Sequence, residues 1–243
     1  MFDPIKKAEK VARIVTKDDL RKYYRFRSAR FYGGIATADC VGCCLQCIFC
    51  WSWREVTNPG ASGHFYTPKD VARRLARIAR KKSFRNIRVS GNEPTIARGH
   101  LLKLLEMVPF DRLFILETNG ILIGHDRTYA EDLARFENLH VRVSIKGTHE
   151  KEFSRLTGAH PEGFGLQLKA LENLRREAVS THPAVMASFS THDDIDALRR
   201  QLVQIDPDFK DIEIEELTLY GDVEKRLKQA SVTYGTADDP QSI

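Results

Sequence analysis

Three cysteines near residue 45 have a spacing that suits an iron–sulfur cluster. Cys43, Cys47 and Cys50 follow the pattern C-x3-C-x2-C, and Phe49 directly precedes the last of them. Three thiolates this close in sequence can hold three irons of a [4Fe–4S] cube, which leaves the fourth iron without a protein ligand. An open metal position is typical of a catalytic site, because another molecule can bind there. The pattern therefore predicts a cluster with one accessible iron.

A second set of cysteines has the same spacing. All five cysteines of the chain lie between residues 40 and 50, and Cys40, Cys44 and Cys47 also follow C-x3-C-x2-C. In that register Gln46, not an aromatic residue, precedes the last cysteine. We therefore favour the register that begins at Cys43, with Cys40 and Cys44 as buried small residues or spare thiols.

A structural zinc site and a disulfide framework are the alternatives. Structural zinc sites usually draw two ligand pairs that are well separated in sequence, whereas this chain offers only scattered histidines beyond the cysteine segment. Disulfides need an oxidising compartment, and residues 1–10 lack the apolar stretch of an export signal. We expect a cytoplasmic protein without membrane association, because no apolar run approaches the ~20 residues that span a bilayer.

The positive charge is concentrated at the N-terminus. The 243 residues carry a net charge of +5, and residues 1–30 contain ten Lys/Arg against four Asp/Glu. Residues 21–32 interleave cations with aromatic side chains, a pattern that could bind nucleic acid. We favour an amphipathic element whose aromatics pack on the domain while its cations stay in water. We divide the chain into this N-terminal segment (1–30), a core (31–232) and a polar C-terminal tail (233–243).

The core alternates between short apolar runs and helical patterns. This alternation predicts a parallel α/β sheet with right-handed crossovers. We count about six strand–helix units, too few for an eight-unit barrel, and therefore predict an open, partial (β/α)6 barrel. Strands are expected near residue 33 and at 86–90, 113–117, 140–145, 184–189 and 212–219. Helices are expected at 68–82, 100–108, 128–136, 161–176, 193–204 and 223–229.

Polar residues follow several of these strands, where parallel α/β folds place their chemistry. The run Ser90-Gly-Asn-Glu-Pro94 offers Gly91 for a positive φ and Glu93 as a carboxylate for an ammonium group. The run Glu117-Thr-Asn-Gly120 follows the next strand. A plain β-turn centred on Asn119 and Gly120 would explain that pair without any ligand.

Two later strands also end in polar residues. Ser144 and Lys146 follow the expected strand 140–145 closely, although a lysine after a strand is common on protein surfaces. Ser188 and Ser190 lie at the end of the expected strand 184–189, where serines are also ordinary cap and turn residues.

The cysteine spacing together with residues 90–94 resembles the radical S-adenosylmethionine (SAM) superfamily, and the later motifs resemble pyruvate formate-lyase activating enzyme most closely. Asn92 stands in place of the family's second glycine, Glu117 in place of an Asp, and Ser144 in place of another Asp. The longer Glu117 leaves open whether a monovalent cation binds there. The resemblance implies that Cys43, Cys47 and Cys50 bind the cluster and that Lys146 is the catalytic residue at the mouth of the site. It implies SAM-binding roles for Gly91, Asn92, Glu93, Thr118, Asn119, Ser144 and Ser188.

The resemblance also implies a reaction. The cofactors would be a [4Fe–4S] cluster and SAM, which is cleaved reductively to a 5′-deoxyadenosyl radical that abstracts hydrogen from a substrate. A flavodoxin or ferredoxin would supply the electron. We expect an activase that acts on a glycyl-radical protein; radical modification of a small molecule or an RNA base is the alternative. An iron–sulfur or zinc-binding module without enzymatic activity is the alternative of another class.

Overall fold

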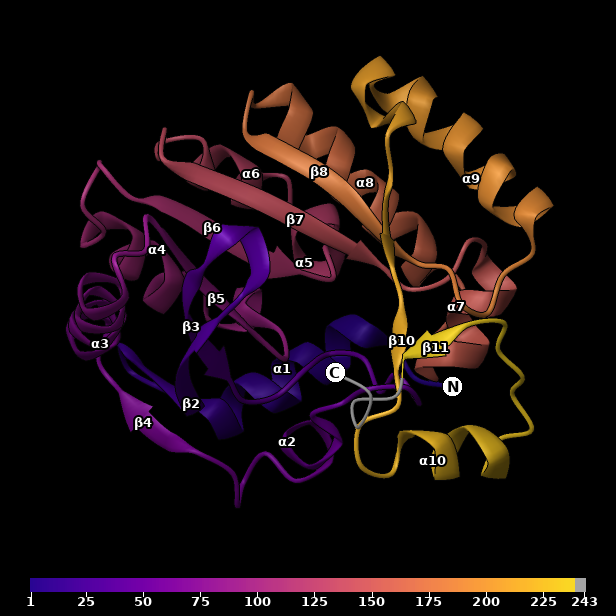
Figure 1. Cartoon of the computed structure of the whole chain (residues 1–243), viewed down its shortest axis with the longest axis horizontal. Helices are drawn as coiled ribbons and strands as arrows, with labels where there is room; N and C mark the ends of the chain where they lie inside the picture. Colours follow the sequence, from indigo (N-terminus) through magenta and orange to yellow (C-terminus); the bar gives the residue numbers. More distant parts are fainter. Residues whose placement is uncertain (239–243) are drawn as a thin grey trace.

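Six parallel strands form most of one sheet (Figure 1). The structure is a computed structural model, and it describes residues 1–238 of the chain. Each neighbouring pair of the six strands is parallel, and helices lie between them along the chain. This confirms the predicted partial (β/α)6 barrel. In sheet order the strands are β3 (Ile35–Cys40), β5 (Asn86–Gly91), β6 (Leu113–Thr118), β7 (Leu139–Ile145), β8 (Ser180–Met186) and β9 (Glu213–Glu215).

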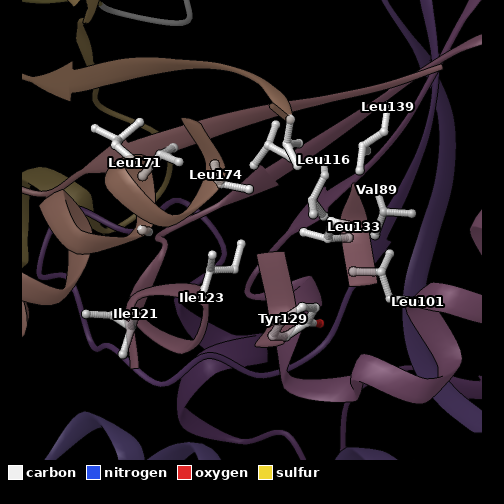
Figure 2. Packing of buried hydrophobic residues seen from close by; sticks show 14 of the residues in the cluster. Val89, Leu101, Leu116, Ile121, Ile123, Tyr129, Leu133, Leu139, Leu171 and Leu174 are labelled. Atoms are coloured by element: carbon white, nitrogen blue, oxygen red, sulfur yellow. The ribbon is translucent and has the colours of Figure 1, made fainter. Parts of the chain in front are cut away.

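Helices cover one face of this sheet, and the hydrophobic core lies between the helices and the strands. Figure 2 shows the strand residues Val89 and Leu116 in one buried cluster with Leu101, Tyr129 and Leu171, which come from three different helices. Because side chains alternate along a strand, the neighbours of these apolar residues point to the opposite face. That inner face is polar, and it contributes to the candidate site. The helices are α3 (Pro68–Lys82), α4 (Arg98–Glu106), α5 (Ile121–His125), α6 (Thr128–Leu133), α7 (Glu150–Thr157), α8 (Gly163–Arg176) and α9 (His192–Ile205).

Local capping explains where two of these helices begin. Thr67 precedes α3, its hydroxyl accepts from the backbone N–H of Asp70, and Pro68 occupies the first helical position, where its missing N–H costs nothing. Thr191 and Asp194 form a capping box at the start of α9. The helix starts expected near residues 68 and 193 therefore match the structure.

The second half of the sheet differs from the expected boundaries. Strand β8 ends at Met186, not at residue 189, because its pairing with β9 stops at Met186 and Glu215. The expected strand 212–219 is interrupted and forms β9 and then β10 (Leu217–Thr218). The expected C-terminal tail contains β11 (Ala237–Asp238), which pairs parallel with β10. Residues 239–243 of that tail lie outside the described part of the chain.

The N-terminal segment is built into the same sheet. Helix α1 (Pro4–Val15) and strand β1 (Thr16–Lys17) lead into β2 (Leu20–Ala29), which runs antiparallel to β3 and also pairs with β4 (His64–Tyr66). Of the aromatics in residues 21–32, Tyr23 is buried as expected, whereas Phe31 and Tyr32 are exposed.

Two cations of β2, however, do not stay in water. Arg21 and Lys22 are buried. The Arg21 guanidinium donates to the carbonyls of Val15 and Glu93, and the Lys22 ammonium donates to the carbonyls of Pro59 and Gly60. Backbone carbonyls thus replace the water that these cations lose.

Within residues 1–238, no helix is both long enough and apolar enough to cross a membrane.

Candidate cofactor-binding site

A cavity of about 970 Å³ opens at the carboxyl ends of the parallel strands. Cys43, Cys47 and Cys50 all line it. Cys40 and Cys44, by contrast, are fully buried in the hydrophobic core. The structure thus brings the expected cysteine triad to one cavity and places the two other thiols in the protein interior.

Contacts from distant parts of the chain hold the cysteine loop in place. Its backbone pairs with the end of α7, through bonds from Gln46 and Ile48 to the carbonyls of Thr157 and Leu156. Arg226, on helix α10 (Val223–Gln229), donates to two carbonyls of the loop. The loop is therefore part of the folded core.

The N-terminal helix α1 supports the loop from another side. A Cβ on Gly42, which has a φ of +88°, would lie 2.6 Å from a methyl group of Val11. The Lys7 ammonium donates to the carbonyl of Leu45 at 3.3 Å. This close packing explains why a glycine precedes the first cysteine of the triad.

Burial opposes deprotonation of two of the three thiols in the triad. Burial raises the pKa of the Cys47 and Cys50 thiols. A hydrogen bond with Cys44 lowers the pKa of Cys43 and raises that of Cys44. Cysteines bind metals as thiolates, so loading this site would release protons.

The donor set fits a cluster. In a cube each thiolate binds a different iron, so the three sulfurs need not converge on one atom. In the described part of the chain, no three His, Cys, Asp or Glu side chains converge closely enough to hold a single metal ion. Cys43, Cys47 and Cys50 thus offer three sulfur donors on a shared cavity, as a cube with one open iron requires.

The loop after β5 lies directly against the cysteine loop. Gly91 has a φ of +98°, and a Cβ there would lie 2.8 Å from the backbone nitrogen of Cys40. Asn92 accepts from the backbone N–H of Gly42 at 2.7 Å and donates to the hydroxyl of Ser52 at 2.7 Å. Gly91 and Asn92 both line the cavity.

Glu93 lies in a buried hydrogen-bond network at the end of β5. Its side chain is fully buried, and its carboxylate accepts hydrogen bonds from Thr95, from the Thr118 hydroxyl at 2.7 Å and from the Asn119 backbone N–H at 2.7 Å. Burial raises the pKa of this carboxyl group. These contacts tie the ends of β5 and β6 together. The contact of Glu93 with an ammonium group stays a prediction.

Thr118 and Asn119 bring the end of β6 to the cavity wall. The Asn119 amide nitrogen lies 3.6 Å from the sulfur of Cys43 and 3.3 Å from that of Cys44. The residues Asn119 and Gly120 therefore do more than form a turn, because the Asn119 side chain reaches the thiols.

Ser144 and Lys146 also line the cavity, at the end of β7. The Lys146 ammonium lies 3.0 Å from a carboxylate oxygen of Glu215, and the Ser144 hydroxyl donates to the other oxygen. Arg142 pairs with both Glu213 and Glu215. Burial alone would raise the pKa of Glu215, but the Lys146 and Arg142 cations lower it to about 2.

Ser188 has a structural contact instead of a place on the cavity wall. Its hydroxyl accepts from the backbone N–H of Leu217 at 3.0 Å, and its carbonyl accepts from Gly235. Because β8 ends earlier than expected, Ser188 falls in the turn beyond the strand, where it fixes β10. The cavity wall near this point is formed by Met186, Leu217 and Thr218.

Ion pairs on the inner face were not anticipated from the sequence. Arg88 pairs with Glu117 at 2.6 Å, and Glu117 also accepts from Ser90 and Tyr32. Both carboxylate oxygens of Glu117 are thus hydrogen-bonded, and these polar side chains line the cavity. Alternation along the strands is the signal that could have found these residues, because Arg88 stands two positions before Ser90.

Comparisons with known proteins identify the family and the fold. A sequence model of the radical SAM superfamily matches residues 39–202, more than half of the chain. Among curated proteins, no sequence matches the chain.

Solved structures with a similar fold include three that cover most of this chain. The first is SuiB of Streptococcus suis, with 16% identity, a TM-score of 0.58, and coverage of 84% of this chain and 47% of that chain. The second is anSMEcpe, with 19% identity, a TM-score of 0.56, and coverage of 72% of this chain and 49% of that chain. The third is TYW1, with 16% identity, a TM-score of 0.55, and coverage of 86% of this chain and 77% of that chain. The chain spans about half the length of the SuiB and anSMEcpe chains, and at these identities the likeness shows the fold.

Proposed function

The chain belongs to the radical SAM superfamily, whose members use a [4Fe–4S] cluster and SAM. On this premise, we propose that the protein abstracts a hydrogen atom from a polypeptide substrate. The observation that carries this proposal is the opening of Cys43, Cys47 and Cys50 onto one cavity. Those three thiolates would hold three irons, which leaves the fourth iron without a protein ligand.

The other cavity residues would bind SAM and the substrate. When bound, the cluster supplies an electron that cleaves SAM to methionine and a 5′-deoxyadenosyl radical. Gly91 allows the backbone to approach closely, while Asn92, Thr118 and Asn119 offer polar groups beside the cysteines. Lys146 and Ser144 form a polar patch with Glu215 that can meet a charged group of the ligand. The protein's part is to position these groups and to exclude water.

A polypeptide is the favoured substrate. SuiB was solved bound to the precursor peptide SuiA, and anSMEcpe was solved with SAM and a peptide. Phe31, Tyr32 and Trp51 are exposed and line the cavity, so they could contact an entering chain. Within this class we propose an activase that acts on a glycine of a glycyl-radical protein, as the resemblance to pyruvate formate-lyase activating enzyme implies.

A small molecule is the second candidate substrate. TYW1, of which the chain covers 77%, was solved with a lysine–pyruvate adduct bound. An RNA base is less favoured, because Arg21, Lys22, Arg25 and Arg27 are all engaged by groups of the protein itself.

A flavodoxin- or ferredoxin-type protein is the proposed electron donor. The five cysteines are free thiols in the structure. Because free thiols persist in a reducing compartment, we propose the cytoplasm as the site of action.

Isotope transfer tests the proposal. The anaerobically reconstituted protein, given SAM and a reductant, should release 5′-deoxyadenosine. With a candidate glycyl-radical protein deuterated at the glycine α-carbon, deuterium should appear in the 5′-deoxyadenosine. Release without deuterium transfer from any peptide, but with transfer from a deuterated small molecule, would move the assignment to the second candidate.

A further inference from the structure

Asn92 stands between the two ends of the cysteine loop. It lies on the loop after β5, and its amide contacts Gly42 just before the triad and Ser52 just after it. Ser52 is buried, and its hydroxyl lies 3.5 Å from the sulfur of Cys50. Three residues thus connect the start of the loop to its last cysteine.

The backbone fixes the direction of these hydrogen bonds. The N–H of Gly42 can only donate, so the Asn92 group that meets it is the amide oxygen. The Asn92 nitrogen must then face Ser52 and donate to its hydroxyl oxygen. The Ser52 hydrogen is thereby left free to point at the sulfur of Cys50.

The position of Ser52 supports this direction. Ser52 is the N-cap residue of α2 (Trp53–Thr57), and a serine there usually accepts from the first turn of its helix. Its side chain makes no such bond with residues 53–57. The hydroxyl is instead used between Asn92 and Cys50.

We propose that Gly42, Asn92 and Ser52 form a hydrogen-bond relay that donates to the Cys50 sulfur and raises the reduction potential of the cluster. The inference rests on the proposed function, in which Cys50 is a cluster ligand. Hydrogen bonds to cluster sulfurs help set the potential, because they stabilise the more negative, reduced state. Asn92 and Ser52 are positioning residues that act through Cys50.

The test is the midpoint potential of the reconstituted cluster in the full-length protein. S52A removes the donor without changing charge and should shift the potential to a more negative value at full iron content. S62A is the matched control: Ser62 is a buried serine whose hydroxyl has no hydrogen-bond partner among the described residues. It should leave the potential unchanged. A fully loaded S52A protein with the wild-type potential would overturn the relay.

A second variant, N92D, tests the relay without a change at Ser52 itself. In N92D the carboxylate accepts from both Gly42 and Ser52, which turns the hydroxyl away from Cys50. N92D should therefore lower the potential, and a wild-type potential in N92D would refute the relay.

The S52A/N92D double variant separates the relay from the added negative charge. The relay predicts a smaller effect of N92D in the S52A background, and an equal effect in both backgrounds would refute it. A wild-type protein that takes up no iron would instead refute the proposed function.

Discussion

The backbone N–H of Asn119 donates a 2.7 Å hydrogen bond to the buried carboxylate of Glu93, and the side chain of the same asparagine reaches the sulfur of Cys43. The ends of β5 and β6 and the cysteine loop are therefore linked through two residues. A substitution of Glu93 should therefore alter the position of the Asn119 side chain beside the Cys43 thiol, although Glu93 itself lies beneath the cavity wall.

Replacement of Glu93 by alanine should destabilise the fold. E93A leaves the donors of Thr95, Thr118 and Asn119 without their acceptor in a buried place, and each such group costs about 1–3 kcal/mol. We expect the free energy of unfolding in urea to fall by about 3 kcal/mol. Glu106 is exposed at the end of α4, and E106A is the control with little effect. Equal stability of E93A and E106A would contradict the supporting role of Glu93.

The two glycines Gly91 and Gly99 should respond in opposite ways to alanine. G91A forces a Cβ to 2.8 Å from the Cys40 nitrogen at a φ of +98°, which should cost at least about 1 kcal/mol. Gly99 lies in α4 and a Cβ there meets nothing within 4 Å, so G99A should stabilise by up to about 1 kcal/mol. Thermal unfolding measures both, and a neutral G91A would show that the loop after β5 can shift freely.

Lys146 should contribute to SAM binding. Its ammonium lies on the cavity wall beside Glu215, and a charge-assisted contact with the ligand is worth about 1.5–3 kcal/mol. K146M should therefore weaken SAM binding about tenfold or more. The matched control is K151M, because Lys151 is exposed on α7. Equilibrium binding under anaerobic conditions gives both constants, and equal affinities for the two variants would remove Lys146 from the site.

The Glu215 carboxyl group should make stability depend on acid pH. Its pKa in the folded protein is about 2, below the ordinary value of 4.5, mainly because Lys146 and Arg142 oppose the effect of burial. A lowered pKa stabilises the fold above the ordinary pKa, and this stabilisation is lost as the pH falls toward 2. Between pH 5 and pH 3 the wild type should lose about 1–2 kcal/mol more than E215Q. Parallel stability curves for the two proteins would contradict this.

The sequence predicted the architecture well because the parallel strands and their helices have strong local patterns. The run around Val89 is apolar on its outward side, and Thr67 with Pro68 marks a helix start that the structure reproduces. Strand β8 was harder, because pairing with β9, a tertiary effect, decides that it ends at Met186. The buried Arg21 was missed for the same reason, since the carbonyls of Val15 at the end of α1 and of the distant Glu93 accept its hydrogen bonds.

The candidate site was predicted in part. The cysteines, Gly91, Asn92, Thr118, Asn119, Ser144 and Lys146 meet at one cavity, as their places at strand ends suggested. The direction in which a side chain points is not contained in such a motif. Glu93 is bonded to Thr118 beneath the cavity wall, and Ser188 is bonded to Leu217. The contact of Asn119 with the thiols likewise depends on how two separate loops pack.

The most direct test is reductive cleavage of SAM by cysteine variants after anaerobic reconstitution. C43A, C47A and C50A should each lose the cluster absorbance and the release of 5′-deoxyadenosine, because each removes a ligand that opens onto the cavity. C40A and C44A, which change buried thiols, should retain both. Loss of cluster and activity in C40A, together with retention in C50A, would contradict the assignment of the cluster to Cys43, Cys47 and Cys50.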